Sequence, residues 1–423
     1  MKRICNIFAL TCMVVTFVGC QEVGVPNAEN EIPMDGNQRY IHFDTSVSTR
    51  GTLYTGDVLT ADFYVLGYQY PYNTDGGWAT AKALATPNVF DDTPTLVEHK
   101  GNYFSYGVPK PWTSNKYSFF ACYASDYTNV KLFDDGTTKT GEPYITYTLP
   151  PSTSDDPRPL VDLMTAGYID TDVKISQSIV MNMHHRLASV DVAVRNYDEI
   201  DHDGDQSDEN PTPKVPVTIE ITELRVNLSN ITNTSAKIYL NPDEGAVYPE
   251  DSFKDKDEDG NVIVKNNVPT TPYTFTIVGT GTAWAPNTFD VKPNSNDDSA
   301  MRFVTNAEGI NISSLLLIPQ ITPLKGEGTL YFKKKYKVND NDNWIYIPNP
   351  QPITGKNDSY LYTAPLNIDF KNRSLLEGRR YFIEISFTSD VVSVNIISAD
   401  EWDEFNQDAD GDGKKDNIDY EFE

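Results

Sequence analysis

The chain has 423 residues, which is too long for one compact core and indicates two or three domains. Its formal net charge of −27 argues against nucleic acid and anionic lipid head groups as partners, because such a surface repels them. Hydrophobic residues make up 39% of the chain and aromatic residues 12%, so packed cores are expected and wholesale disorder is not.

The N-terminus has the pattern of an export signal. The basic pair Lys2-Arg3 precedes an apolar run that is too short for a convincing membrane span. The stretch FVGC at residues 17–20 resembles a bacterial lipobox. This predicts a signal peptide over residues 1–19 and a lipid anchor, palmitate included, on Cys20. The alternative is an ordinary signal peptide in which the cysteine occurs by chance.

The sequence after Cys20 is dominated by strand patterns. Residues 20–37 are polar and aperiodic, which predicts a tether. Beyond Tyr40, short apolar-polar alternations recur between turn clusters, as in YFIEISF at residues 381–387. No amphipathic pattern of three helical turns occurs in this part. The sequence therefore predicts an all-β protein built from β-sandwiches.

A composition break at residues 196–216 divides the strand patterns into two groups. This segment is rich in acids, lacks an apolar run and predicts a linker or a long surface loop. We therefore predict one sandwich over residues 38–195, a second over residues 217–407, and an acidic tail over residues 408–423.

Adjacent histidines, His184 and His185, invite a metal or acid–base interpretation. In a strand, neighbouring side chains point to opposite faces and cannot share one ion without a bulge. The other histidines do not have zinc-ligand spacing, and the motifs of common nucleophilic and phosphate-binding sites are absent. We predict a structural role for the pair, no catalytic residues and no enzymatic activity. Cys122, the one cysteine after Cys20, lies in an apolar run and is predicted to be buried.

The acidic tail has a pattern of its own. Residues 408–419, DADGDGKKDNID, place oxygen ligands at the spacing of a calcium loop, with a glycine at the sharp turn. The pattern resembles the loops of thrombospondin type 3 repeats. The alternative is an acidic tail without a bound ion. Residues 201–208 and 255–261 are weaker versions, for which a hairpin turn or solvated loop is favoured. The candidate Ca²⁺ ligands are Asp408, Asp410, Asp412, Lys414 through its main-chain carbonyl, Asp416 and Asp419.

One strand pattern resembles a known family. HHRLASVDVAV, residues 184–194, is similar to a strand of the fimbrillin-like lipoproteins of Bacteroidales, the type V pilin superfamily. The resemblance covers nearly the whole chain after Cys20 and implies two tandem transthyretin-like β-sandwiches. It also implies export to the outer membrane surface and a role as pilus subunit, anchor or tip. Further similar pieces, in the family's order, are Thr49-Arg50, FYVLGY (63–68), YSFFACY (117–123), DLMTAG (162–167), LLLIPQ (315–320), EGRRYFIEISF (377–387) and Trp402.

The resemblance implies assembly by strand exchange. In the family a surface protease cuts after a basic residue, the first strand leaves, and the groove accepts a strand from another subunit. By position, Arg50 followed by Gly51 is the candidate site for an arginine-specific protease, and residues 39–50 are the strand removed. Arg39 is the second candidate. The alternative is an uncleaved tip or anchor protein in which Arg50 ends a strand.

The donated strand is expected from the C-terminal region, at residues 390–398, although a closing core strand is the favoured interpretation there. The chain then ends in an acidic tail instead of an apolar strand, which favours an accessory or tip subunit. The expected partners are other fimbrial subunits, the protease, the outer membrane through the lipid, and a host or bacterial surface ligand. The second function considered is a non-catalytic glycan-binding lipoprotein using aromatics such as Trp78 and Trp112.

Overall fold

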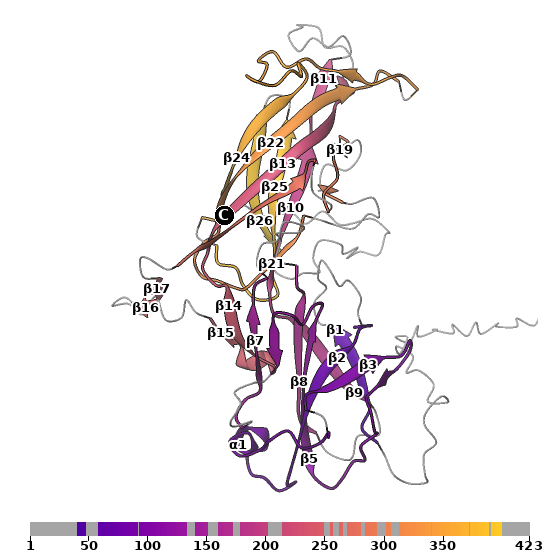
Figure 1. Cartoon of the computed structure of the whole chain (residues 1–423), viewed down its shortest axis with the longest axis vertical. Helices are drawn as coiled ribbons and strands as arrows, with labels where there is room; N and C mark the ends of the chain where they lie inside the picture. Colours follow the sequence, from indigo (N-terminus) through magenta and orange to yellow (C-terminus); the bar gives the residue numbers. More distant parts are fainter. Residues whose placement is uncertain are drawn as a thin grey trace, which may run out of the picture.

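The protein is elongated, with two β-rich halves stacked along its long axis (Figure 1). The predicted all-β class is confirmed, since the helices among the described residues are α1 (Trp78–Ala81) and the short 3₁₀ helix η2 (Pro242–Glu244). The computed structural model describes residues 40–47, 58–91, 93–132, 140–150, 160–171, 178–201, 214–248, 254–256, 262–264, 269–280, 284–293, 302–305, 313–339, 341–371, 373–388 and 391–399.

The lower half in Figure 1 contains a seven-stranded and a four-stranded sheet. Leu66 and Phe120 of the larger sheet share one core with Ile145 and Tyr147 of the smaller sheet, because each sheet has an apolar face. The larger sheet has the order β1 (Phe43–Val47), β9 (Ile179–His185), β8 (Leu163–Thr171), β5 (Lys116–Ala124), β2 (Phe63–Tyr70), β3 (Thr95–His99), β4 (Phe104–Ser105), and the smaller β15 (Ala246–Val247), β14 (Ser235–Tyr239), β7 (Tyr144–Thr148), β6 (Val130–Leu132).

The upper half contains a five-stranded and a six-stranded sheet. Val192 and Ile383 of one lie in the same core as Leu224 and Leu330 of the other. The first sheet has the order β20 (Arg302–Phe303), β10 (Ala188–Asn196), β25 (Arg380–Thr388), β26 (Val391–Ala399), with β21 (Leu315–Leu317) also on β10. The second has the order β18 (Thr271–Val278), β13 (Thr218–Ile231), β22 (Lys325–Tyr336), β23 (Ile345–Tyr346), with β19 (Phe289–Val291) on β13 and β24 (Tyr362–Asp369) on β22.

Two small antiparallel pairs lie outside these sheets. They coincide with the two weaker acidic patterns, because Asp201 lies in one pair and Asp255 in the other. Strand pairing at these positions agrees with the hairpin interpretation favoured from the sequence. The pairs are β11 (Glu199–Asp201) with β12 (Lys214–Pro216), and β16 (Lys254–Lys256) with β17 (Val262–Val264).

Strand pairing crosses the division predicted at residues 196–216. β10 falls within the predicted sandwich 38–195, yet it pairs with β25 in the upper half. β14 falls within the predicted sandwich 217–407, yet it pairs with β7 in the lower half. The reason is that hydrophobic periodicity shows which residues are apolar and does not show which strands pair. The two halves thus exchange strands, and one hydrophobic core runs through both.

The two histidines stand where the chain passes from the lower half to the upper half. His185 ends β9 and is buried, with its Nδ1 2.8 Å from the Asp162 carboxylate. His184 lies on the other face of the strand, where its Nε2 is 3.3 Å from the side-chain nitrogen of Asn182. The prediction that the two side chains point to opposite faces is therefore confirmed.

Arg186 follows directly and is fully buried at this junction. Its Nη2 donates to the carbonyl of Gly245, 2.7 Å away, and its Nε lies 2.9 Å from Oε1 of Glu377. Burial raises the pKa of Glu377, and the Arg186 charge opposes that rise. One guanidinium thus joins main chain from the lower half to the turn before β25 in the upper half.

A second buried ion pair holds β10 to β25. Arg380 Nε donates to Asp191 Oδ2 at 2.7 Å, and Ser189 donates to the same oxygen at 3.0 Å. The Arg380 guanidinium also lies 5.1 Å from the ring centroid of Phe303 and 5.0 Å from that of Phe382. Residues far apart in sequence are therefore fixed in one register of a parallel strand pair.

Replacing Asp191 by alanine should lower the free energy of unfolding by about 3–5 kcal/mol, because the Arg380 charge would stay buried without its partner. Urea denaturation of the full chain measures the effect. Glu98→Gln is the matched control, since the exposed Glu98–Lys100 pair should contribute less than about 0.5 kcal/mol. Equal losses in the two variants would contradict this account of the β10–β25 pair.

Candidate functional site

The first strand, β1, is an edge of the seven-stranded sheet. It pairs in parallel with β9, from Phe43 opposite Ile179 to Val47 opposite Met183. An edge strand has one neighbour in its sheet, so its main-chain hydrogen bonds can be replaced by those of another strand. β1 can therefore leave without separating any other pair of strands in this sheet.

The side chains of this segment alternate strictly between buried and partly exposed. Ile41, Phe43 and Thr45 are 1%, 4% and 3% exposed, while His42 and Asp44 lie partly in solvent. This is the period of a strand with one face on a core. The segment is bound chiefly by three inward-pointing side chains.

Phe43 is the central one of the three and enters an aromatic pocket. Edge-to-face and tilted ring pairs of this kind each contribute about 0.5–1.5 kcal/mol beyond burial of area. The rings around Phe43, with centroid distances, are Phe119 (5.4 Å), Tyr106 (5.7 Å), Phe90 (6.1 Å) and Phe63 (6.4 Å). We call the space occupied by Ile41, Phe43 and Thr45 the first-strand groove.

Polar contacts fix the main chain of the segment above this groove. The Ile41 carbonyl accepts from the Tyr106 hydroxyl at 2.6 Å, and the Ile41 N–H donates to the Lys110 carbonyl at 2.9 Å. Burial raises the pKa of Tyr106 to about 12, so its hydroxyl stays protonated and can donate. Thr45 Oγ1 donates to the Leu59 carbonyl at 3.0 Å.

Sequence reasoning found the strand and missed its pocket. Phe90 and Tyr106 come from segments outside the strands, so no periodic pattern marks them as core residues. The one sequence signal for the groove was the alternation of Ile41, Phe43 and Thr45. It indicates which side chains enter the groove, but it does not indicate which residues line it.

The predicted cleavage and modification residues lie outside the described residues. Arg50 and Gly51 follow Val47 after an interval of two residues, and Arg39 directly precedes the first described residue. Cys20 and the candidate calcium ligands of the tail, Asp408 to Asp419, also lie outside. These assignments stay predictions.

The segment predicted as a donor strand or closing strand is β26. It pairs antiparallel with β25 along its whole length and forms the edge of its sheet, which is the position of a closing strand. Val392, Val394 and Ile396 face the core and are only partly buried. β26 is thus an integral strand of the upper half.

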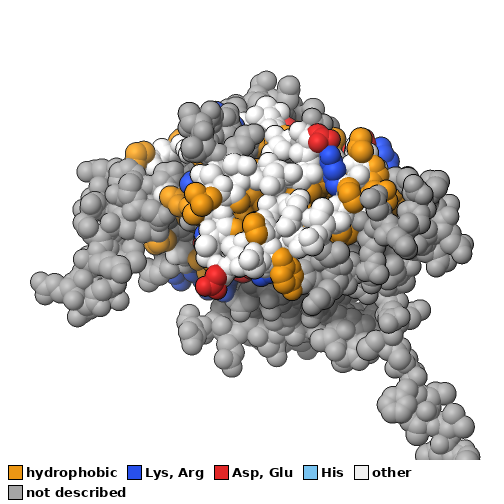
Figure 2. Space-filling model, turned by 90° about the horizontal axis from the view of Figure 1, so that it is seen from below, with side chains coloured by type: hydrophobic (Ala, Val, Ile, Leu, Met, Phe, Trp, Pro, Cys, Tyr) orange, Lys and Arg blue, Asp and Glu red, His pale blue; other side chains and the backbone are white. Residues whose placement is uncertain are grey.

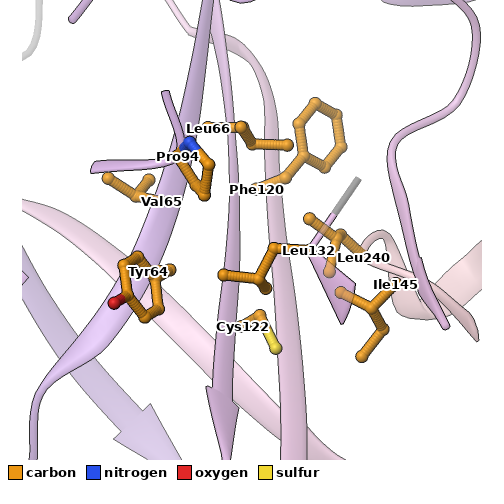
Figure 3. Close-up of a pocket in the computed structure, with 9 residues that line it drawn as sticks. All are labelled: Tyr64, Val65, Leu66, Pro94, Phe120, Cys122, Leu132, Ile145 and Leu240. Atoms are coloured by element: carbon orange, nitrogen blue, oxygen red, sulfur yellow. The ribbon is translucent and has the colours of Figure 1, made fainter. Parts of the chain in front are cut away.

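Cys122 is a core residue, as predicted. It borders a cavity of about 10 Å³ lined by apolar side chains (Figure 3). Such a volume holds about one water molecule at most and no organic ligand. Burial raises the pKa of the thiol, which keeps it protonated and unreactive.

The two tryptophans suggested for glycan binding pack against other rings. Trp78 is 2% exposed, and its ring centroid lies 4.8 Å from that of Tyr68. Trp112 lies 4.8 Å from Tyr117. Figure 2 shows the end of the lower half, where hydrophobic side chains are scattered among neutral ones on the described part of the surface. Of the aromatics suggested for glycan binding, Trp78 is thus a core residue and Trp112 is partly buried against a neighbouring ring.

Two features are absent from the part of the chain that the structure describes. Within it, no three histidine, cysteine, aspartate or glutamate side chains lie close enough together to hold a metal ion. Nor does this part contain a helix of the length and hydropathy needed to cross a membrane.

The comparisons with protein-family models and with curated proteins find no match. Among solved structures, a fimbrial protein from Bacteroides vulgatus superposes with a TM-score of 0.50 at 14% identity, covering 86% of this chain and all of that one. The chain has the fold of a fimbrial protein. The resemblance to fimbrillin-like proteins is thereby confirmed at the level of the fold. A proposed cell adhesion protein from Bacteroides ovatus is 11% identical, with a TM-score of 0.41 over 86% of this chain and 96% of that one.

Phe43→Ala should destabilise the lower half by about 3–5 kcal/mol, because the aromatic pocket would be left unfilled. Chemical denaturation measures this loss, and proteolysis of residues 40–47 should accelerate with it. Ser46→Ala serves as the control, since Ser46 makes one exposed hydrogen bond, to Asn182. A loss at Phe43 no larger than that at Ser46 would show that the groove does not hold β1.

Proposed function

We propose that the protein is a cell-surface fimbrial subunit or accessory adhesin that assembles by exchanging its first strand. The observation that carries the proposal is β1 itself, an edge strand whose buried side chains fill an aromatic groove close to Arg50-Gly51. The shared fold with a fimbrial protein supports the same role. In this role the chain is structural and performs no catalysis.

Cleavage alone would not release the strand, because its buried side chains and its main-chain hydrogen bonds would still hold it. Buried apolar side chains such as Ile41 and Phe43 each contribute about 1.5–3 kcal/mol, and the main-chain bonds to β9 add to this. After a cut at Arg50 by an arginine-specific protease, the segment is held by these contacts alone. An incoming strand from another subunit that makes the same contacts can then displace it.

The groove also sets requirements for the incoming strand. It takes an aliphatic side chain at the position of Ile41 and an aromatic ring at the position of Phe43, two residues further along. β26 has no aromatic residue, and its removal would break its pairing with β25. The end of the chain, NIDYEFE, alternates Ile418, Tyr420 and Phe422 with acidic residues. We therefore propose residues 418–422, and not residues 390–398, as the donated strand.

Two further proposals concern residues outside the described part. A lipid on Cys20 would anchor the subunit in the outer membrane, and loss of palmitate labelling in Cys20→Ala tests this. Calcium bound by Asp410, Asp412 and their neighbours would order residues 408–419, whose last candidate ligand, Asp419, lies at the start of the proposed donated strand. Titration calorimetry with Ca²⁺ should show binding that Asp410→Asn removes, and absence of heat in the unaltered chain would refute the site.

Digestion with an arginine-specific protease should give a new N-terminus at Gly51 and a ladder of oligomers on native gels. Arg50→Ala should abolish both products, because no other cut frees β1 from the chain. Arg39→Ala is the matched control and should leave both unchanged. Cleavage at Gly51 that leaves the protein monomeric would refute assembly by strand exchange.

The donated strand is tested in the same assay. Tyr420→Asp should remove the oligomer ladder while leaving cleavage intact, because a charge cannot enter the aromatic pocket without a partner. Glu421→Gln changes the neighbouring residue, which would point away from the groove, and should preserve the ladder. Normal oligomers from Tyr420→Asp would exclude this segment as the donor.

A further inference from the structure

A groove of about 290 Å³ lies at the junction of the two halves. One wall comes from residues 245–248, which follow β14 of the lower half. The other walls come from residues 319–321 and 375–377, on either side of β22 and β24 in the upper half. Any side chain that fills this groove contacts both halves at once.

The chemistry of the groove suits an apolar occupant. Leu376 is 44% exposed at its rim, although Leu375 beside it is buried. The acidic group in the groove, Glu377, already has partners, since it lies 2.9 Å from Arg186 Nε and accepts from the Tyr248 hydroxyl at 3.4 Å. The groove therefore presents apolar surface without an unmet charge.

The described chain ends beside this groove. Ala399, the last residue of β26, pairs with Arg380, three residues after Glu377. Trp402 is three residues further along the chain, and three extended residues span about 10 Å. Trp402 can therefore reach the groove of its own subunit, and an indole ring that enters an apolar groove buries a large apolar area.

Charge complementarity supports the same occupant. Trp402 stands in the sequence DEWDE, residues 400–404, with two acids on each side. The segment that forms the rim carries Arg373, which is exposed, and Arg379, which is partly exposed, and both also take part in other interactions. In a chain of net charge −27, this is a favourable place for an acidic segment.

We propose that Trp402 occupies the junction groove in the uncleaved monomer and holds the beginning of the acidic tail against both halves. The docking of Trp402 does not depend on the proposed function.

Disulfide trapping tests the docking in the uncleaved monomer, using residues 21–423. Cysteines replace Leu376 at the rim and Glu401 beside the tryptophan, and the native Cys122 is buried. Mild oxidation should join them within one chain, because docking brings the two residues within disulfide range. Adding Trp402→Ala should slow the reaction by about tenfold or more, since docking supplies the effective concentration.

The matched control pairs Glu401→Cys with Leu84→Cys, which is 88% exposed and follows α1 at the far end of the lower half. This pair should not cross-link within one chain. A Leu376 cross-link that is unaffected by Trp402→Ala, or that joins two chains, would overturn the proposal. Failure of strand exchange would instead appear as absent oligomers in every variant, with the cross-link intact.

Discussion

The insertion of Phe43 between the rings of Phe63, Phe90, Tyr106 and Phe119 is the interaction on which the lower half depends. It fills a core that would otherwise open to solvent at the edge of the sheet. The residue belongs to a short edge strand, so the stability of this core depends on a segment with few other contacts. Under the proposed function, a strand from another subunit with suitable side chains would fill the same groove.

The upper half is arranged differently. The Asp191–Arg380 ion pair ties β10 to β25, and the Arg186–Glu377 pair ties the junction to the turn before β25, so both link distant parts of the sequence. Removing one partner of such a pair lowers the stability of the fold strongly, because the other charge stays buried without compensation. In the proposed exchange, the upper half is the fixed body and the lower half carries the strand that is replaced. The junction groove lies where the two meet.

The sequence predicted those features that depend on local periodicity. Alternation identified the strands, and it placed His184 and His185 on opposite faces of one strand, as the structure has them. It did not predict that β10 joins the upper half or that β14 joins the lower half, because pairing depends on contacts between distant residues. The aromatic pocket was missed for a related reason, since Phe90 and Tyr106 come from irregular segments.

Hydrogen exchange at the β9 amides, residues 179–183, tests the central claim most directly, because β9 is the strand that β1 covers. Strand exchange predicts slow exchange in the intact subunit, fast exchange once the cut segment is removed, and slow exchange again in assembled material that lacks residues 40–47. Assembled material that retains residues 40–47 on β9 would contradict it.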